Sequence, residues 1–293
     1  MTVSEKIHKH CLPDDTRGAT PGMNSHPKLR VGAVNYLNTK PLIYGFERHA
    51  PAAELVLDLP SRLADNLARG RLDVALIPSV EFFLDPSYTI VSDACIACRG
   101  PVLSVKLFSR GPIESIRTLA LDEGSRTSVA LVRVLLSERF NVQPQLERLP
   151  VNATLDDADT DAVLLIGDRA MHSPAGRFEV VWDLGDEWCR WAQLPFVFAM
   201  WVARSGTELD GLDRALSEAR DEGVAHLEEI ADREAAPLGL TRPQCVSYLR
   251  DNLHFYLGSR EQRGLELFRK KAAQMGLIPS GVEFGLDDCQ TPR

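Results

Sequence analysis

The chain has 293 residues, of which 44% are hydrophobic and 25% are charged, and its formal net charge is -8 with a pI near 5.4. This length and composition are typical of a soluble globular protein with two domains or lobes, and the acidic balance argues against a nucleic-acid or membrane-surface partner, which needs a concentrated basic face. No apolar run approaches the roughly 20 residues of a membrane span.

The first segment, residues 1–27, is rich in His, Lys, Asp, Pro and Gly and lacks the apolar region of a secretory signal. We expect a disordered lead-in to a cytoplasmic protein, and the start of translation at Met1 or Met23 stays open. His8, His10 and Cys11 could bind a metal, but a flexible tail favours no such site. Six cysteines in a chain of this length fit a reducing cytosol.

The next segment alternates short apolar runs with helical patterns. The apolar run Leu29–Val34 predicts a strand that ends in a polar turn containing Asn38. A helix at 41–49, a strand at 55–59, a helix capped by Ser61 and a strand at 72–77 follow. This βαβαβ order predicts a parallel sheet with covering helices.

Polar residues follow the strands of this first unit. Ser79 comes directly after the strand at 72–77, and Ser104 begins an extended run that comes after a further strand at 90–96. Open α/β sheets bind ligands outside the carboxyl ends of their strands, so we expect these side chains to share a crevice with Asn38.

A second α/β unit begins with a strand at 118–121. The hydroxyl-rich segment Ser125–Ser128 leads into a helix whose apolar face includes Val129 and Leu136. Its amino end is either an anion-binding site or a plain N-cap, and spacing alone does not separate the two. A strand at 162–166 ends at Gly167 and Asp168, and an apolar strand at 194–201 returns the chain to the first unit.

Several short motifs are absent, so nucleotide-binding, metallopeptidase and hydrolase functions lose their usual support, although no single absence is decisive. The chain has no G-x-x-x-x-G-K-[ST], no G-x-G-x-x-G after a strand, no H-E-x-x-H and no G-x-S-x-G. Cys95 and Cys98 have C-x-x-C spacing without a second ligand pair, so we expect a structural role. What remains is a crevice that binds a small anion through neutral donors and helix amino ends, in either a binding protein or an enzyme.

The stretch Val-Gly-Ala-Val-Asn-Tyr-Leu-Asn-Thr-Lys-Pro-Leu at residues 31–42 closely resembles the opening motif of the chorismate dehydratase family, which acts first in the futalosine route to menaquinone. Blocks of the same family follow in order at residues 69–78, 100–104, 125–128, 165–168 and 194–198. Together they cover residues 28–280, which is more specific than any single motif.

The resemblance implies an α/β, two-lobed type II periplasmic-binding-protein-like fold with a ligand cleft between the lobes. We place lobe 1 at residues 28–115 plus 200–285 and lobe 2 at residues 116–199. The family reaction is the loss of water from chorismate to give 3-[(1-carboxyvinyl)oxy]benzoate, a carbon–oxygen lyase (hydro-lyase) step with no metal or organic cofactor. The oligomeric state and the extent of lobe closure stay open.

The resemblance maps catalytic roles onto Asn38 and Ser104. We expect the substrate-binding residues to be Ser79, Ser125, Arg126, Thr127, Ser128, Gly167 and Asp168. Arg126 has the alternative role of a structural ion pair, and Asp168 that of fixing its own turn. The proton acceptor in the elimination is not identified.

Two other functions are compatible with this fold. A non-catalytic solute-binding protein would hold a small anion without turnover, although the missing export signal counts against it. A sister enzyme of the same pathway carries a Ser-Pro-Cys-Pro-Asn-Asp opening motif, which is absent here.

Overall fold

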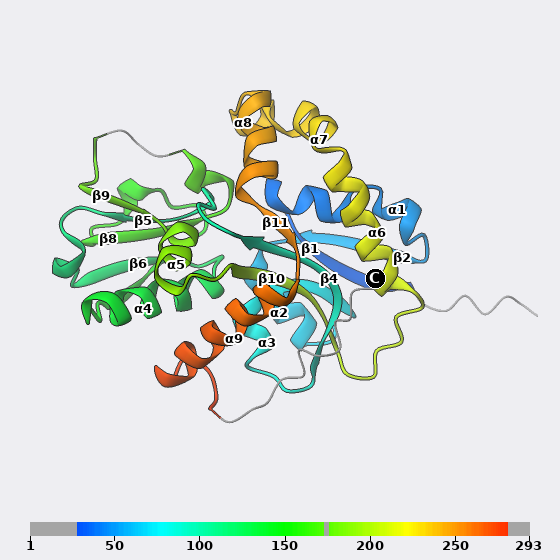
Figure 1. The fold of residues 1–293 in the computed structure, drawn as a ribbon, viewed down its shortest axis with the longest axis horizontal. Helices are drawn as coiled ribbons and strands as arrows, with labels where there is room; N and C mark the ends of the chain where they lie inside the picture. The colour runs from blue at the N-terminus through cyan, green and yellow to red at the C-terminus, as the bar shows by residue number, and fades with distance from the viewer. Residues whose placement is uncertain (1–27, 173–175, 281–293) are drawn as a thin grey trace, which may run out of the picture.

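Two mixed β-sheets, each the centre of one lobe, organise the chain in the computed structural model (Figure 1). The structure describes residues 28–172 and 176–280. The predicted lead-in at 1–27, with Met1, Met23 and the metal set at His8, His10 and Cys11, lies outside the described residues. The α/β two-lobed class predicted from the sequence is confirmed.

The first sheet has six strands in the order β11-β4-β10-β3-β1-β2. Its first three strands are parallel, as predicted: β1 pairs with both β2 and β3. The other strands run antiparallel, because β10 returns from the second lobe and inserts between β3 and β4. The strands are β1 Leu29–Val34, β2 Ala53–Asp58, β3 Val74–Pro78, β4 Tyr88–Cys98, β10 Phe196–Arg204 and β11 His254–Tyr256.

The second sheet has five strands in the order β7-β6-β8-β5-β9. Here β6 is parallel to β7 and β8, and β5 is antiparallel to β8 and β9. The strands are β5 Val105–Ser109, β6 Thr118–Asp122, β7 Gln145–Leu149, β8 Ala162–Ile166 and β9 Val180–Asp183.

The change of sheet lies between β4 and β5, and the return lies before β10. We predicted lobe 2 at residues 116–199, but β5 already pairs with strands of the second sheet and β10 already pairs with strands of the first. Gly100 and Pro101 give the physical reason for the early change of sheet, since they follow the end of β4 and interrupt the extended chain before β5. The division into domains stays a prediction, and its segment 281–285 lies outside the described residues.

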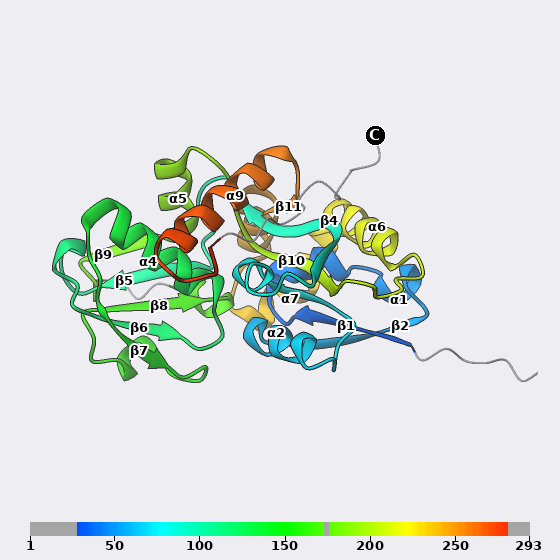
Figure 2. The same ribbon diagram turned by 90° about the horizontal axis from the view of Figure 1, so that it is seen from below.

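Helices cover both sheets (Figures 1 and 2). The predicted helix at 41–49 is instead a 3₁₀ turn followed by one α-turn, and Ser61 lies inside α2, which begins at Pro60 because proline suits the first helical position. The α-helices are α1 Phe46–His49, α2 Pro60–Ala68, α3 Ser79–Phe82, α4 Thr127–Phe140, α5 Leu184–Ala192, α6 Leu212–Ala225, α7 Leu227–Glu234, α8 Arg242–Ser247 and α9 Ser259–Gln274. The remaining turns are 3₁₀, η1 Leu37–Ile43, η2 Ile113–Ser115, η3 Leu155–Asp157, η4 Asp168–Met171 and η5 Ala236–Leu238, with a π-helical turn η6 Tyr248–Asn252.

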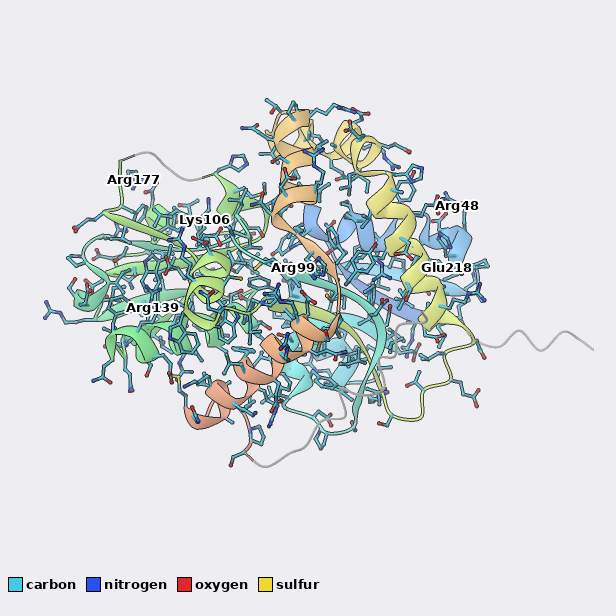
Figure 3. The ribbon with its side chains drawn as sticks, in the orientation of Figure 1. Arg48, Arg99, Lys106, Arg139, Arg177 and Glu218 are labelled. Atoms are coloured by element: carbon cyan, nitrogen blue, oxygen red, sulfur yellow. The ribbon has the colours of Figure 1, made fainter. Side chains whose placement is uncertain are left out.

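Helix α9 braces the junction between the lobes (Figure 2). Arg99, labelled in Figure 3, leaves the end of β4 and donates from Nε to the buried carboxylate of Glu261 on α9 at 2.9 Å. At its other end α9 pairs with lobe 2 through Lys271 and Glu138 at 2.8 Å. Both lobes therefore contact one helix. Across residues 28–172 and 176–280, no helix combines the length and hydropathy needed to cross a bilayer.

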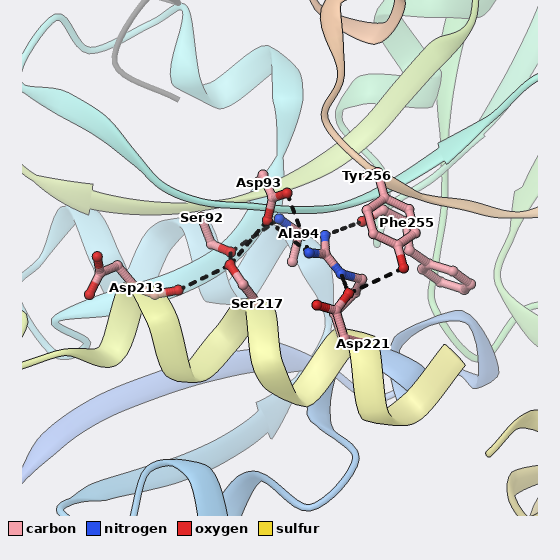
Figure 4. Close-up of polar contacts among 9 residues, drawn as sticks. Ser92, Asp93, Ala94, Asp213, Ser217, Asp221, Phe255 and Tyr256 are labelled. Carbon is pink, nitrogen blue, oxygen red and sulfur yellow. Dashed lines mark hydrogen bonds and ion pairs between the residues drawn. The ribbon is translucent and has the colours of Figure 1, made fainter. Parts of the chain in front are cut away.

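A buried arginine ties α6 to the first sheet. The Arg220 guanidinium is 3% exposed and pairs with Asp93 of β4 at 3.0 Å, and it donates to the Phe255 carbonyl of β11 at 3.2 Å. Figure 4 shows this network, in which Ser217 also donates to Asp93 and Tyr256 lies over the guanidinium. A buried charge is stable only when paired in this way, so the network holds one arrangement of α6 on the sheet.

Candidate active site

A cleft with an empty volume of about 520 Å³ lies between the two lobes, and part of it is open to solvent. Both sheets contribute to its walls through residues at strand ends and helix starts. Of the predicted site residues it is lined by Asn38, Ser104, Ser125, Arg126, Thr127, Ser128 and Gly167; the other lining residues are Val34, Tyr36, Pro60, Pro78, Ile96, Val102, Val105, Ile166, Phe198 and Ala199. Ser79 and Asp168 lie behind this surface.

Asn38 projects from η1, the 3₁₀ turn that follows β1. Its amide oxygen accepts a hydrogen bond from Thr39 Oγ1 at 3.3 Å, while its amide nitrogen has no acceptor among the described residues. Helix α6 supports η1 from behind: a Cβ added at Gly223 would lie 2.0 Å from the Pro41 carbonyl oxygen, so only glycine permits this approach. The Asn38 amide is therefore positioned by its backbone and free to bind a ligand.

Asp168 of lobe 2 contacts the backbone next to Asn38. Its carboxylate accepts from the Leu37 N–H at 3.1 Å and 3.3 Å, and burial raises its pKa above the ordinary value. The structure thus gives this carboxylate a partner across the cleft, in the opening turn of lobe 1. A direct contact of Asp168 with a substrate stays a prediction.

Tyr36 closes the cleft over Gly167. A Cβ added at Gly167, whose φ is +71°, would lie 2.8 Å from the Tyr36 ring, so glycine is needed for both conformation and space. Burial, reinforced by the nearby negative charge of Asp122, raises the pKa of Tyr36 to about 12. The Tyr36 hydroxyl is therefore neutral at physiological pH. Tyr36 was not among the predicted site residues, although it lies in the opening motif.

The amino end of α4 forms part of the lobe 2 wall. Its N-cap residue is Arg126, and no described side chain caps the first turn. The Thr127 hydroxyl turns away instead, accepting from the Val80 N–H at 3.1 Å and lying 3.4 Å from the Ser79 hydroxyl, which donates to the Val197 carbonyl at 2.7 Å. The first N–H groups of α4 therefore lack a side-chain cap, and binding of an anion at this helix end stays a prediction.

Arg126 connects the lobes through two ion pairs. Its guanidinium lies 2.6 Å from Asp65 of α2 and 3.1 Å from Glu81 of α3. Burial raises the pKa of Glu81 despite the neighbouring positive charge. The contacts match the alternative role of a structural ion pair, and binding of a substrate carboxylate by Arg126 stays a prediction.

Ser104 sits at the end of a strained turn. Leu103 has a φ of +60°, which is unfavourable for a residue with a side chain, and the Asp183 carboxylate holds this turn by accepting from the Val102 N–H at 2.9 Å and the Leu103 N–H at 2.6 Å. Asp183 also caps α5, accepting from the N–H groups of Gly185 and Asp186. Asp183 was not among the predicted site residues, although an aspartate directly before a helix is an N-cap signal.

Cys95 and Cys98 are fully buried in β4. The Cys189 thiol of α5 donates to the Cys98 carbonyl at 3.9 Å, so this side of the junction also connects the lobes. Neither position belongs to the cleft lining.

Comparison with known proteins gives a family as well as a fold. A family model described as menaquinone biosynthesis matches residues 29–274. A chorismate dehydratase from Thermus thermophilus is 34% identical over an alignment of 264 residues, and the match covers 81% of this chain and 93% of that protein.

Solved structures with the same architecture are more distant in sequence. A protein from Archaeoglobus fulgidus has a TM-score of 0.65 at 16% identity and covers 87% of this chain and 100% of its own. A Candida albicans protein described as having the generic periplasmic binding protein fold has a TM-score of 0.56 at 12% identity, covering 88% and 92%. The periplasmic aliphatic sulphonate binding protein of Escherichia coli has a TM-score of 0.53 at 13% identity, covering 92% and 97%. These likenesses show the periplasmic-binding-protein-like fold.

Proposed function

Because the chain belongs to the menaquinone biosynthesis family, we propose that it is a chorismate dehydratase, which converts chorismate to 3-[(1-carboxyvinyl)oxy]benzoate and water. The observation that supports this proposal most directly is the shared cleft. Asn38 and Ser104, which the family resemblance marks as functional, line it together with the uncapped amino end of α4. The arrangement supplies neutral donors and a helix dipole to a small dianion.

Much of the driving force of this reaction comes from the formation of an aromatic ring in the product. Chorismate carries a ring hydroxyl, a neighbouring ring proton and two carboxylates, and loss of the hydroxyl with that proton makes the ring aromatic. The C–H bond breaks, its electron pair forms the new ring double bond, and the C–O bond breaks. The departing hydroxide takes up one proton to leave as water, which balances the proton lost from the ring carbon. The protein therefore has to orient the dianion and stabilise the charge that develops on the departing oxygen.

The substrate's own enolpyruvyl carboxylate is the proposed proton acceptor. The enolpyruvyl group is attached to the ring carbon that bears the departing proton, and the cleft residues Asn38 and Ser104 offer an amide and a hydroxyl instead of a strong base. In this scheme the two side chains orient that carboxylate or donate to the leaving hydroxyl. The backbone N–H groups at Thr127 and Ser128 hold the ring carboxylate, and Arg126 adds positive charge nearby.

The remaining assignments are part of the same proposal. The enzyme is a hydro-lyase that works without a metal or organic cofactor in the cytoplasm, and Ser79 and Asp168 act by positioning Thr127 and the opening turn. In this proposal residues of both lobes contact the ligand. Each lobe is a domain built around one of the two sheets.

A product assay tests the proposal. Purified protein is incubated with chorismate, and formation of the enolpyruvyl benzoate is followed by chromatography with ultraviolet detection. We expect turnover that scales with protein concentration. Tight chorismate binding without product under any condition would instead indicate a solute-binding protein on the same fold.

A further inference from the structure

Tyr248 is a buried tyrosine whose hydroxyl has no hydrogen-bond partner. Its side chain is 1% exposed, and no acceptor or donor reaches its hydroxyl within residues 28–172 and 176–280. Buried hydroxyls are normally paired, because burial removes their bonds to water. An unpaired one at this depth requires an explanation from its surroundings.

Tyr248 is close to Ser104 and to the loop that ends at Ser104. Tyr248 opens η6, a π-helical turn, a geometry that often occurs at functional sites. At the other end of this turn the Asn252 amide donates to the Pro101 carbonyl at 2.9 Å, which joins η6 to the loop that ends at Ser104. Burial raises the pKa of the Tyr248 hydroxyl well above its usual range, and the adjacent Ser104 hydroxyl acts in the opposite direction.

Ser104 has acceptor capacity to spare. Its hydroxyl is 1% exposed and makes one long contact, to the Val102 carbonyl at 3.4 Å. A serine hydroxyl donates once and accepts twice, so its own proton can point in only one direction at a time. A donor placed behind Ser104 would leave that proton for the cleft.

We propose that Tyr248 is a positioning residue for the dehydration: its hydroxyl donates to Ser104 Oγ from behind the cleft and thereby directs the Ser104 proton toward the leaving hydroxyl of the substrate. This inference rests on the proposed function. It assigns Tyr248 a role through Ser104 and no contact with substrate. It also explains why a tyrosine, and not a phenylalanine, occupies a site with no other polar partner in the described chain.

The test compares Tyr248→Phe with wild type in the chorismate assay. We expect kcat to fall about tenfold with KM changed less than twofold, because the variant loses an orientation needed in the transition state and no substrate contact. We expect the thermal midpoint to change little, since the Tyr248 hydroxyl contributes to orienting Ser104 and has no other hydrogen-bond partner in the described chain. A purely structural role would lower the midpoint and leave kcat unchanged.

A double variant shows whether Tyr248 acts through Ser104. If it does, Tyr248→Phe combined with Ser104→Ala has the same kcat as Ser104→Ala alone. Tyr88→Phe, the same chemical change at a buried position in β4 outside the cleft lining, is the matched control and keeps wild-type kcat.

The failures of the two proposals are distinguishable. The inference is overturned if Tyr248→Phe has the kcat of wild type, or if the double variant has a lower kcat than Ser104→Ala alone. In both cases chorismate turnover by the unmodified protein still supports the proposed function. Absence of product from the unmodified protein overturns both.

Discussion

The two walls that carry Asn38 and Ser104 are built differently. Asn38 lies on a 3₁₀ turn, is partly exposed and has one side-chain hydrogen bond, to its neighbour Thr39. Ser104 is 1% exposed and follows a strained residue that the Asp183 carboxylate holds in place. The Asn38 side chain can therefore adjust its position, whereas the backbone around Ser104 is held in place before any ligand binds. We call these the adaptable wall and the preorganised wall.

This difference indicates a division of labour. Preorganised donors in a water-poor site stabilise charge at the moment it develops, without the cost of reorienting. A side chain on a supported but less constrained turn is better suited to receive the substrate and adjust to it. We therefore expect Ser104 to act mainly on turnover and Asn38 on binding and turnover together.

Replacing Ser104 or Asn38 by alanine should have the largest effect on turnover, and it tests the difference between the two walls most directly. We expect Ser104→Ala to lower kcat by about 10²- to 10³-fold with little change in KM, the range found for loss of one charge-stabilising donor. Asn38→Ala should lower kcat and also raise KM. Steady-state kinetics with chorismate measures both, and circular dichroism checks that each variant is folded. Wild-type turnover in both variants would contradict the assignment of these two residues.

The preorganisation itself is tested at Asp183. Asp183→Ala leaves the Val102 and Leu103 N–H groups without their acceptor and uncaps α5. We expect kcat to fall about tenfold and the free energy of unfolding to drop by roughly 2–3 kcal/mol, from the lost bonds and cap. Urea unfolding and chorismate kinetics measure the two effects.

Asp161→Ala is the matched control for this change. Its carboxylate also accepts from two backbone N–H groups, those of Arg117 and Thr118 at 2.8 Å and 2.9 Å, but outside the cleft lining. The control should lose stability and keep kcat. Equal loss of kcat in both variants would show that general softening of lobe 2, and not the turn before Ser104, explains the effect.

The smallest expected effect is on stability at high pH and comes from Tyr36, which lies beside Asn38 in the adaptable wall. Burial raises the pKa of Tyr36 from 10.0 to about 12, so the folded protein retains this proton where the unfolded chain loses it. The resulting stabilisation is present below pH 10 and is lost as the pH rises toward 12. When the pH rises from 10 to 12, the free energy of unfolding of wild type should fall by about 2–3 kcal/mol more than that of Tyr36→Phe.

Urea unfolding of both proteins at pH 9, 10, 11 and 12 measures this difference. Cys245, whose pKa burial raises to about 11, titrates in the same range but is present in both proteins, so its contribution cancels. Parallel pH profiles for the two proteins would show that the Tyr36 hydroxyl is not buried against Gly167 in solution.

Much of the framework could be predicted from local patterns. The buried strands β1, β3 and β8 were visible as apolar runs. Of the residues that follow them, Asn38 and Gly167 line the cleft, whereas Ser79 and Asp168 are not part of its lining. The start of α4 was visible for the same reason. The helix predicted at 41–49 is confirmed only at α1, Phe46–His49, because Pro41 and packing against α6 favour a 3₁₀ turn in the part before it.

By itself the sequence determined the family and the α/β class, because short motifs and apolar periodicity are local properties of the chain. The functional pair Asn38 and Ser104 stays a prediction from the family motif. Only the tertiary structure decided that β10 inserts between β3 and β4, that Arg126 pairs with Asp65 and Glu81, and that Tyr248 is a neighbour of Ser104. These facts depend on packing between segments far apart in the chain, and no spacing within one segment records which distant side chain fills the space beside it.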